Sequence, residues 1–263
     1  MSHRSRSEGE DRSAQRERSL MRPCRAVVCA AFCAALALAP AAVRAQAGAA
    51  GVRYERIAAS PDGIGKRYMG REIAQVMGWQ GAAWLERAER EQEERTDLLL
   101  PELRLAPGMA VADIGAGTGY IARRMAALVG PTGRVWAVDV QPEMIEMLEA
   151  AAQRAGLAQI RPVLGTASDV KLAAASIDLA IMVDVYHELE FPYEVLASVV
   201  RALKPGGRVV FVEYRAEDPL VPIKALHKMS LAQIKREAAA HRLVLERSAE
   251  PLPWQHIVVF RKG

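Results

Sequence analysis

Three glycines at alternate positions mark the part of this 263-residue chain that is best suited to bind a charged ligand. Gly115, Gly117 and Gly119 follow the largely apolar stretch 111–114 directly, and a helical pattern begins behind them. Glycines at this spacing let the main chain turn sharply and let a ligand lie against bare backbone. The unpaired N–H groups at the start of a helix favour a carboxylate or a phosphate. The loop therefore predicts a site for a nucleotide-like ligand.

The details of the loop separate two classes of ligand. A dinucleotide fingerprint, Gly-x-Gly-x-x-Gly, would need its third glycine where Tyr120 stands. Asp113, inside the preceding strand, would repel a pyrophosphate but can receive an ammonium group. Both residues disfavour a nicotinamide-dependent oxidoreductase and favour a nucleotide that carries an amino acid.

A second acidic residue stands where nucleotide-binding α/β folds hold a ribose. Asp139 ends the next apolar stretch, and a carboxylate there can accept hydrogen bonds from both ribose hydroxyls. Val140 and Met144 would then flank the adenine by apolar contact. The simpler interpretation is that Asp139 only caps the following helix.

The order Asp-x-Gly-x-Gly-x-Gly after an apolar strand resembles the first motif of the class I S-adenosylmethionine-dependent methyltransferases. The resemblance extends from about Leu98 to the C-terminus, and the motif layout is similar to that of the quinone-biosynthesis group. It implies that S-adenosylmethionine is the cofactor and that its methionine end is held by Asp113, Gly115, Ala116, Gly117, Thr118, Gly119 and Tyr120.

The family often has an acidic residue after the third strand, where it meets the adenine amino group. Here Thr166 takes that position, followed by Ala167. Thr166, the backbone of Ala167, or Asp169 reaching back could make this contact instead.

Residues at the ends of the fourth and fifth strands are candidates for catalysis. The resemblance implies that Asp184 contacts the cofactor and that His187, Tyr186 and Glu213 lie near the reacting methyl group. Imidazole titrates near neutral pH, so His187 could remove a proton from an acceptor. Alternatively, His187 and Glu188 only cap the next helix. We predict no bound metal ion.

The elements that position these residues alternate between strand and helix, which is typical of a parallel sheet covered on both faces. We predict an α/β fold with a doubly wound, mostly parallel seven-stranded sheet and a C-terminal antiparallel hairpin. The expected strands are 110–114, 134–139, 160–164, 178–183, 208–214, 243–248 and 257–261. The expected helices are 120–129, 142–154, 192–203 and 230–241, the last opened by a capping box at Ser230.

The segment before the first strand predicts a helical lid. Apolar spacing predicts a helix over 66–77, and the charged run 86–97 predicts a solvated helix face. The lid would span residues 66–104 and precede the methyltransferase domain at 105–263, with residues 46–65 as a linker. Tyr68, Met69, Trp79 and Trp84 are lid residues that could cover the cofactor, although core packing is the simpler role.

The N-terminus has the pattern of a leader. Residues 1–20 are too polar to bury a core and predict disorder. Residues 21–45 have a basic start, an apolar run over 26–39 and a small-residue end at Ala45, which predicts a secretory signal peptide. The apolar run is shorter than the about 20 residues that a membrane-spanning helix needs. Met21 is a candidate for the residue at which translation starts.

Cleavage after Ala45 would change the charge of the protein. The leader holds eight arginines and four acids, so the remainder has 27 basic and 27 acidic residues and does not predict nucleic-acid binding. All three cysteines lie in the leader, which suits an oxidising compartment. Their position also disfavours an arsenite-type methyltransferase that uses cysteine thiolates. We expect a periplasmic or secreted protein if the leader is cleaved and a cytoplasmic one otherwise.

These observations leave two functions open. The first is a methyltransferase for a small-molecule acceptor, methylated at oxygen, nitrogen or carbon. The second is an exported methyltransferase-like domain that binds a small ligand without catalysis, because little S-adenosylmethionine would be found outside the cytoplasm. The acceptor and the oligomeric state cannot be derived from the sequence.

Overall fold

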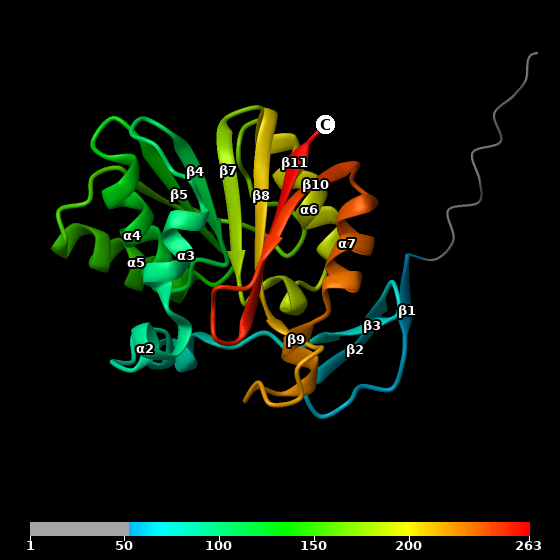
Figure 1. The fold of residues 1–263 in the computed structure, drawn as a ribbon. Coiled ribbons are helices and arrows are strands. Elements are labelled where there is room, and N and C mark those ends of the chain that lie inside the picture. Colours follow the sequence, from blue (N-terminus) through cyan, green and yellow to red (C-terminus); the bar gives the residue numbers. More distant parts are fainter. Residues whose placement is uncertain (1–52) are drawn as a thin grey trace, which may run out of the picture. The chain divides into compact units, whose positions relative to one another are not determined.

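A mostly parallel sheet forms the centre of the structure, a computed structural model that describes residues 53–263 (Figure 1). The chain divides into two units, 1–48 and 49–263, and all the described residues lie in the second. The strand order is β10-β11-β8-β7-β4-β5-β6, with the short β9 paired beside β8. The strands are β4 Ala110–Ile114, β5 Arg134–Asp139, β6 Ile160–Leu164, β7 Ile177–Val183, β8 Leu203–Arg215, β9 Lys228–Met229, β10 Leu243–Ala249 and β11 Gln255–Lys262. Strand β11 is antiparallel to both of its neighbours, so the predicted sheet with its terminal hairpin is confirmed.

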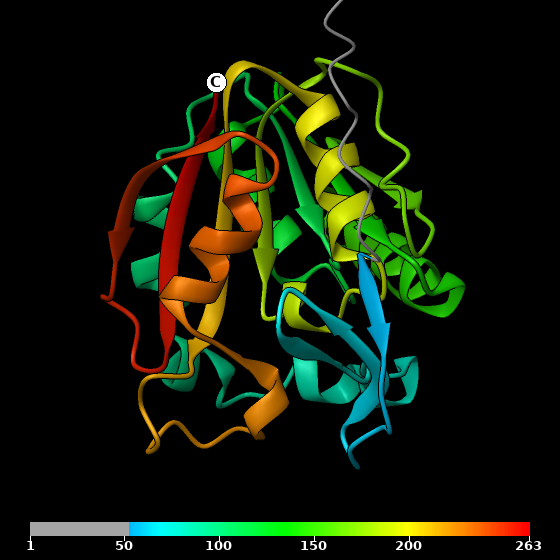
Figure 2. The same cartoon turned by 90° about the vertical axis from the view of Figure 1, so that its right-hand side faces the viewer.

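Helices cover both faces of this sheet, as Figures 1 and 2 show. They are α3 Thr96–Glu102, α4 Tyr120–Val129, α5 Pro142–Arg154, α6 Pro192–Ala202 and α7 Leu231–Ala239. Alternate residues of each strand pack into two separate hydrophobic cores, because successive side chains of a strand point to opposite faces of the sheet. Val111 packs in the cluster under α3, α4 and α5, whereas Ala112 packs in the cluster under α6 and α7.

Local sequence signals set the ends of the core helices. Pro142 begins α5, where its missing N–H costs nothing. The Ser230 hydroxyl accepts a 3.1 Å hydrogen bond from the Gln233 N–H at the start of α7, so the predicted cap is confirmed. Several boundaries of the later elements differ from the prediction by one or two residues, and one differs by more, since β8 begins at Leu203 rather than Arg208 and includes the glycine-rich turn.

The predicted helix over 66–77 is wrong. This segment belongs to a separate antiparallel sheet of order β1-β2-β3, formed by β1 Tyr54–Arg56, β2 Gly63–Tyr68 and β3 Arg71–Ala74. Met69 and Gly70 both have positive φ, at 45° and 93°, which is the geometry of a tight hairpin turn. Strand β1 and the first three residues of β2 lie within the expected linker 46–65, so part of that linker forms sheet.

The charged run 86–97 is not one solvated helix face. The run begins after the 3₁₀ turn η1 Trp79–Gly81 and the short helix α1 Ala82–Leu85, forms the short helix α2 Arg90–Glu94, and ends in the first turn of α3. The break between α2 and α3 is Arg95, whose φ is 51°. Arg90 and Glu94 are only 6% and 5% exposed, because they face each other beneath the surface.

The predicted disordered extension 1–20 and signal peptide 21–45 lie outside the described residues. Among residues 53–263, none of the helices combines the length and the apolar character that crossing a membrane requires.

Candidate active site

Two adjoining cavities lie at the carboxyl ends of the parallel strands, where α/β folds bind ligands. The larger, of about 490 Å³, includes Gly115, Gly117, Met144 and Asp184 in its wall. The smaller, of about 150 Å³, includes Val140, Thr166 and Ala167. Gly115, Asp139, Val76 and Glu188 line both. An elongated ligand could therefore extend from one cavity into the other.

The glycine loop needs glycine for conformation and for space. Gly115, Gly117 and Gly119 have φ values of 72°, 53° and 84°, a left-handed region that side chains disfavour. A Cβ on Gly117 would lie 2.5 Å from Leu85 Cδ1, and one on Gly115 would lie 2.3 Å from Val185 Cγ2. The loop thus presents bare main chain to the larger cavity.

Asp139 is held where its carboxylate can face both cavities. Its Oδ2 accepts a 2.9 Å hydrogen bond from the Gly117 N–H, and its Oδ1 accepts one of 2.9 Å from the Gln141 N–H. Burial raises the pKa of this carboxyl group, and the two backbone N–H groups oppose that rise. The N-cap of α5 is Gln141, so Asp139 does not cap this helix; it holds the glycine loop to the turn before the helix.

The smaller cavity has the apolar character that a purine ring requires. Thr166 is engaged in closing its own turn, since its hydroxyl accepts a 3.0 Å hydrogen bond from the Asp169 N–H. The Asp169 carboxylate lies 3.1 Å from Arg201 and accepts from the Lys171 N–H at 2.7 Å. Of the three contacts considered for adenine, the backbone beside Ala167 is the least committed to other partners.

Several predicted cofactor residues lie behind the cavity walls rather than in them. Asp113 is buried, and desolvation raises the pKa of its carboxyl group to about 7. Its Oδ2 has no hydrogen-bond partner among residues 53–263. Ala116 and Gly119 are part of the glycine loop. The Thr118 hydroxyl donates a 2.6 Å hydrogen bond to Glu86, and the Tyr120 hydroxyl donates one of 3.0 Å to Glu91. These two side chains fasten the loop to the segment before α3.

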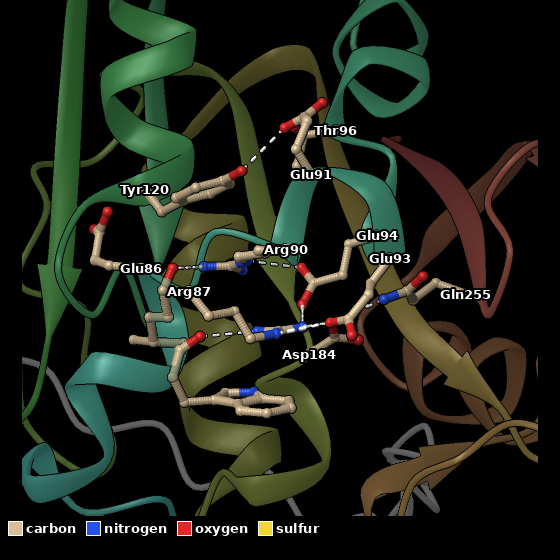
Figure 3. Close-up of polar contacts among 12 residues, drawn as sticks. Glu86, Arg87, Arg90, Glu91, Glu93, Glu94, Thr96, Tyr120, Asp184 and Gln255 are labelled. Atoms are coloured by element: carbon tan, nitrogen blue, oxygen red, sulfur yellow. Dashed lines mark hydrogen bonds and ion pairs between the residues drawn. The ribbon is translucent and has the colours of Figure 1, made fainter.

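Figure 3 shows a network of polar side chains, of which Arg90, Glu94 and Asp184 line the larger cavity. Arg90 Nε and Arg87 Nη2 each donate to Glu94 at 2.8 Å. Asp184 accepts a 3.2 Å hydrogen bond from Gln255 through Oδ2, whereas its Oδ1 has no partner among the described residues. Burial and the nearby Glu94 and Glu213 charges raise the pKa of Asp184 well above its usual range. The sequence analysis missed Arg90 and Glu94 because alternating charges are the pattern of a solvated helix.

The predicted catalytic residues divide between the cavity and the core. His187, in the 3₁₀ turn η2 Tyr186–Glu188, lines the larger cavity, and its Nδ1 lies 2.5 Å from Glu213 Oε2. Glu213 is fully buried and also accepts from the Tyr186 N–H at 2.8 Å, so it orients His187 from behind. The Tyr186 ring packs edge-on against Phe211 with centroids 4.9 Å apart, which places it in the core.

A second histidine, His227, lies beside His187, and this contact was not predicted. His227, in the 3₁₀ turn η3 Ala225–His227, places its Nδ1 3.1 Å from His187 Nε2. Its Nδ1 also lies 3.2 Å from Glu188 Oε1. The loop after β8 showed many ionisable residues, but nothing in the sequence paired His227 with His187.

Comparisons with known proteins find methyltransferases. Residues 112–211 match the family model described as a methyltransferase domain. An uncharacterized methyltransferase of Mycobacterium tuberculosis is 38% identical over 119 residues, which are 45% of this chain and 44% of that protein. A ubiquinone/menaquinone biosynthesis C-methyltransferase of Bordetella parapertussis is 31% identical over 117 residues, 44% of this chain and 45% of that protein. The match thus spans about half the length of these curated relatives.

A solved structure shows the same fold. A SAM-dependent methyltransferase from Aquifex aeolicus has a TM-score of 0.68 at 21% identity, over 72% of this chain and 100% of that chain. The predicted resemblance to the class I methyltransferases is therefore confirmed: residues 112–211 match a methyltransferase domain, and the structure has the class I fold.

Proposed function

We propose that this chain transfers a methyl group from S-adenosylmethionine to a small-molecule acceptor. The methyltransferase domain over residues 112–211 and the class I fold support the reaction class. The Bordetella relative is described as a C-methyltransferase of ubiquinone and menaquinone biosynthesis, which makes a quinone-like ring one acceptor class to test.

The position of Asp139 is the observation that carries this proposal. The side chain lies at the junction of the two cavities, with each carboxylate oxygen already held by a backbone N–H. A carboxylate fixed in this way can accept hydrogen bonds from two ribose hydroxyls. The ribose would sit beside Asp139, with adenine toward Val140 and Ala167 and the methionine end toward Gly115 and Gly117.

The larger cavity suits both charged groups of the methionine end. Asp184 lines this cavity, its Oδ1 has no partner among the described residues, and an ammonium group beside it would stabilise its ionised form. Arg90 lines the same cavity, and its positive charge would attract a carboxylate although Glu94 and Leu85 already accept hydrogen bonds from it. The residues present therefore fit an amino-acid-bearing nucleotide.

The remaining wall of the larger cavity would receive the acceptor. When bound, S-adenosylmethionine supplies a methyl group that its sulfonium already activates, so the protein mainly aligns the reactants. Trp84 and Met77 offer apolar surface, and His187 offers Nε2 as a proton acceptor because Glu213 binds its Nδ1. A protonated acceptor could lose its proton there.

Titration calorimetry of the purified chain with S-adenosylmethionine and S-adenosylhomocysteine tests the cofactor, with NAD as the control ligand. We expect saturable binding of the first two and none of NAD. Asp139→Ala should lose affinity because it removes two charge-assisted hydrogen bonds, each worth about 1.5 to 3 kcal/mol. Glu143→Ala, which changes an acid in the first turn of α5, is the matched control.

Two results would contradict the proposal. Wild-type affinity in a folded Asp139→Ala protein would remove the ribose assignment. No binding of either ligand to the folded wild-type chain would favour the non-catalytic binder instead.

A further inference from the structure

Three potential metal ligands meet in the wall of the larger cavity. His187 Nε2 lies 3.1 Å from His227 Nδ1, which lies 3.2 Å from Glu188 Oε1. The third side of the triangle, from His187 Nε2 to Glu188 Oε1, measures 3.8 Å. All three residues line the cavity, and one potential ligand atom of each lies within 4.8 Å of the other two.

The size of this triangle matches the first coordination shell of a transition metal. Zinc binds imidazole nitrogen and carboxylate oxygen at about 2.0 to 2.2 Å, which places tetrahedral ligands about 3.4 Å from one another. The three observed separations lie close to this value. An ion could therefore be held without movement of η2 or η3. A fourth coordination position would face the cavity.

Glu213 supplies the outer-shell contact that metal-binding histidines usually make. Its Oε2 lies 2.5 Å from His187 Nδ1, so this nitrogen is the donor and Nε2 keeps its lone pair for a metal. Glu213 is itself fixed by the Tyr186 N–H and is fully buried. The carboxylates of Glu188 and Glu213 together would balance the charge of a divalent cation.

We propose that His187, Glu188 and His227 bind a divalent transition metal ion of the zinc type, with Glu213 as the positioning residue. Two histidines and one carboxylate with an open position are typical of a reactive metal rather than a structural one. The inference deepens the proposed function and rests on it for one further point: the acceptor would bring an oxygen donor, such as a phenol or hydroxyl, to the open position. His187 would then serve as a ligand, and the metal would lower the pKa of the acceptor oxygen.

The sequence analysis predicted no metal because the ligands do not form a short spacing motif. His227 follows His187 by 40 residues and comes from a different loop. Without an ion, His227 Nδ1 would donate a hydrogen bond to His187 Nε2 and lie 3.2 Å from Glu188 Oε1. The experiment must therefore measure metal binding itself.

Zinc titration of the chelator-treated full chain tests the proposal. Cys24, Cys29 and Cys33 are replaced by Ser in every protein, so that no thiolate contributes a site. We expect His227→Ala to lose one zinc site and Glu188→Gln, which keeps the shape of the side chain, to weaken that site at least tenfold. His256→Asn is the matched control, because His256 contacts Glu217 and Glu250 outside the cluster. It should keep the site.

Cobalt(II) gives a second measurement that does not depend on activity. Visible absorption bands of a nitrogen- and oxygen-ligated ion should appear with the parent protein and disappear with His227→Ala. Equal zinc stoichiometry and affinity in the parent and in a folded His227→Ala protein would overturn the metal site. S-adenosylmethionine binding is measured on the same samples. Intact cofactor binding without a zinc site would reject only the metal, and a zinc site without cofactor binding would reject the methyltransferase proposal.

Discussion

At the scale of single residues, the glycine loop offers a direct test of the cofactor site. Gly117 combines a left-handed φ of 53° with a Cβ position only 2.5 Å from Leu85. Gly117→Val should therefore abolish S-adenosylmethionine binding, because the side chain would fill the backbone surface on which the ligand lies. Leu85→Ala in the same protein relieves the clash but not the strain, so it should not restore binding.

The measurement for Gly117→Val is calorimetric titration, with circular dichroism to check the fold. Gly130→Ala is the control, because nothing lies within 4 Å of its Cβ position although its φ is also positive. Unchanged affinity in Gly117→Val would mean that the loop is only a turn.

Asp113 predicts how stability depends on pH. Burial raises the pKa of this carboxyl group to about 7, above its value in the unfolded chain. The folded state then holds a proton that the unfolded state has lost, so stability decreases as pH rises between about 4 and 7. Asp184 and Asp139, whose pKa values are also raised, act in the same direction.

Asp113→Asn should make this dependence shallower, because the amide does not titrate. Urea unfolding at pH 5 and pH 7.5 measures the slope, which one group can change by at most about 1.4 kcal/mol per pH unit. A mutant whose stability falls with pH as steeply as that of the wild type would contradict the assignment. Asp97→Asn, at an exposed acid of α3, is the control.

Among the helices and strands, the sequence predicted those that have regular apolar spacing and clear end signals. The bounds of β4, α4, β5, α5 and β6 agree with the expected ranges. Each of these elements is bracketed by glycine, proline or a charged cap, and its apolar residues follow one period. Asp139 was found for the same reason, since a fixed distance from the glycine loop places it at the end of β5.

The prediction failed where distant segments decide the structure. Tyr68 and Ile73 fit a helical spacing, but the Met69–Gly70 turn and the contacts of β3 with η2 and η3 select a hairpin. Arg90 is buried because Glu94 and Leu85 satisfy its guanidinium. His227 meets His187 only after β8 and its loop have folded back. None of these contacts leaves a local pattern that the sequence could reveal.

The ion pair that joins β3 to α7 tests the role of the N-terminal sheet. Arg71 Nε donates to Glu237 at 2.7 Å, and Arg71 Nη1 donates to the His187 carbonyl oxygen at 3.1 Å. Glu237 is fully buried, so Arg71→Met should cost about 3 to 5 kcal/mol by leaving its charge unpaired. Combining this change with Glu237→Gln should recover much of the loss in chemical denaturation. A loss in the double mutant equal to the sum of the two single-mutant losses would show that the pair is not coupled.

For the whole molecule, the first prediction concerns the cellular compartment that contains the mature protein. Residues 21–45 predict a cleaved signal peptide, and we expect the mature chain to begin at Gln46 and to be recovered from the periplasmic or secreted fraction. Mass spectrometry of the purified N-terminus measures this directly. Ala45→Arg should block cleavage, because the recognised site requires small residues, while Gln46→Ser should not.

The location also changes the meaning of the cofactor titration. A mature chain that is exported and still binds S-adenosylmethionine would need a supply of the cofactor beyond the cytoplasm, or would bind a related nucleotide there. Full-length chain confined to the cytoplasm would contradict the export prediction and would place the enzyme where its cofactor is made. Because the mature chain is expected to carry 27 basic and 27 acidic residues, cleavage should also lower its isoelectric point from the value of about 9.1 calculated for the full chain. Isoelectric focusing of both forms therefore gives an independent check on which form the cell contains.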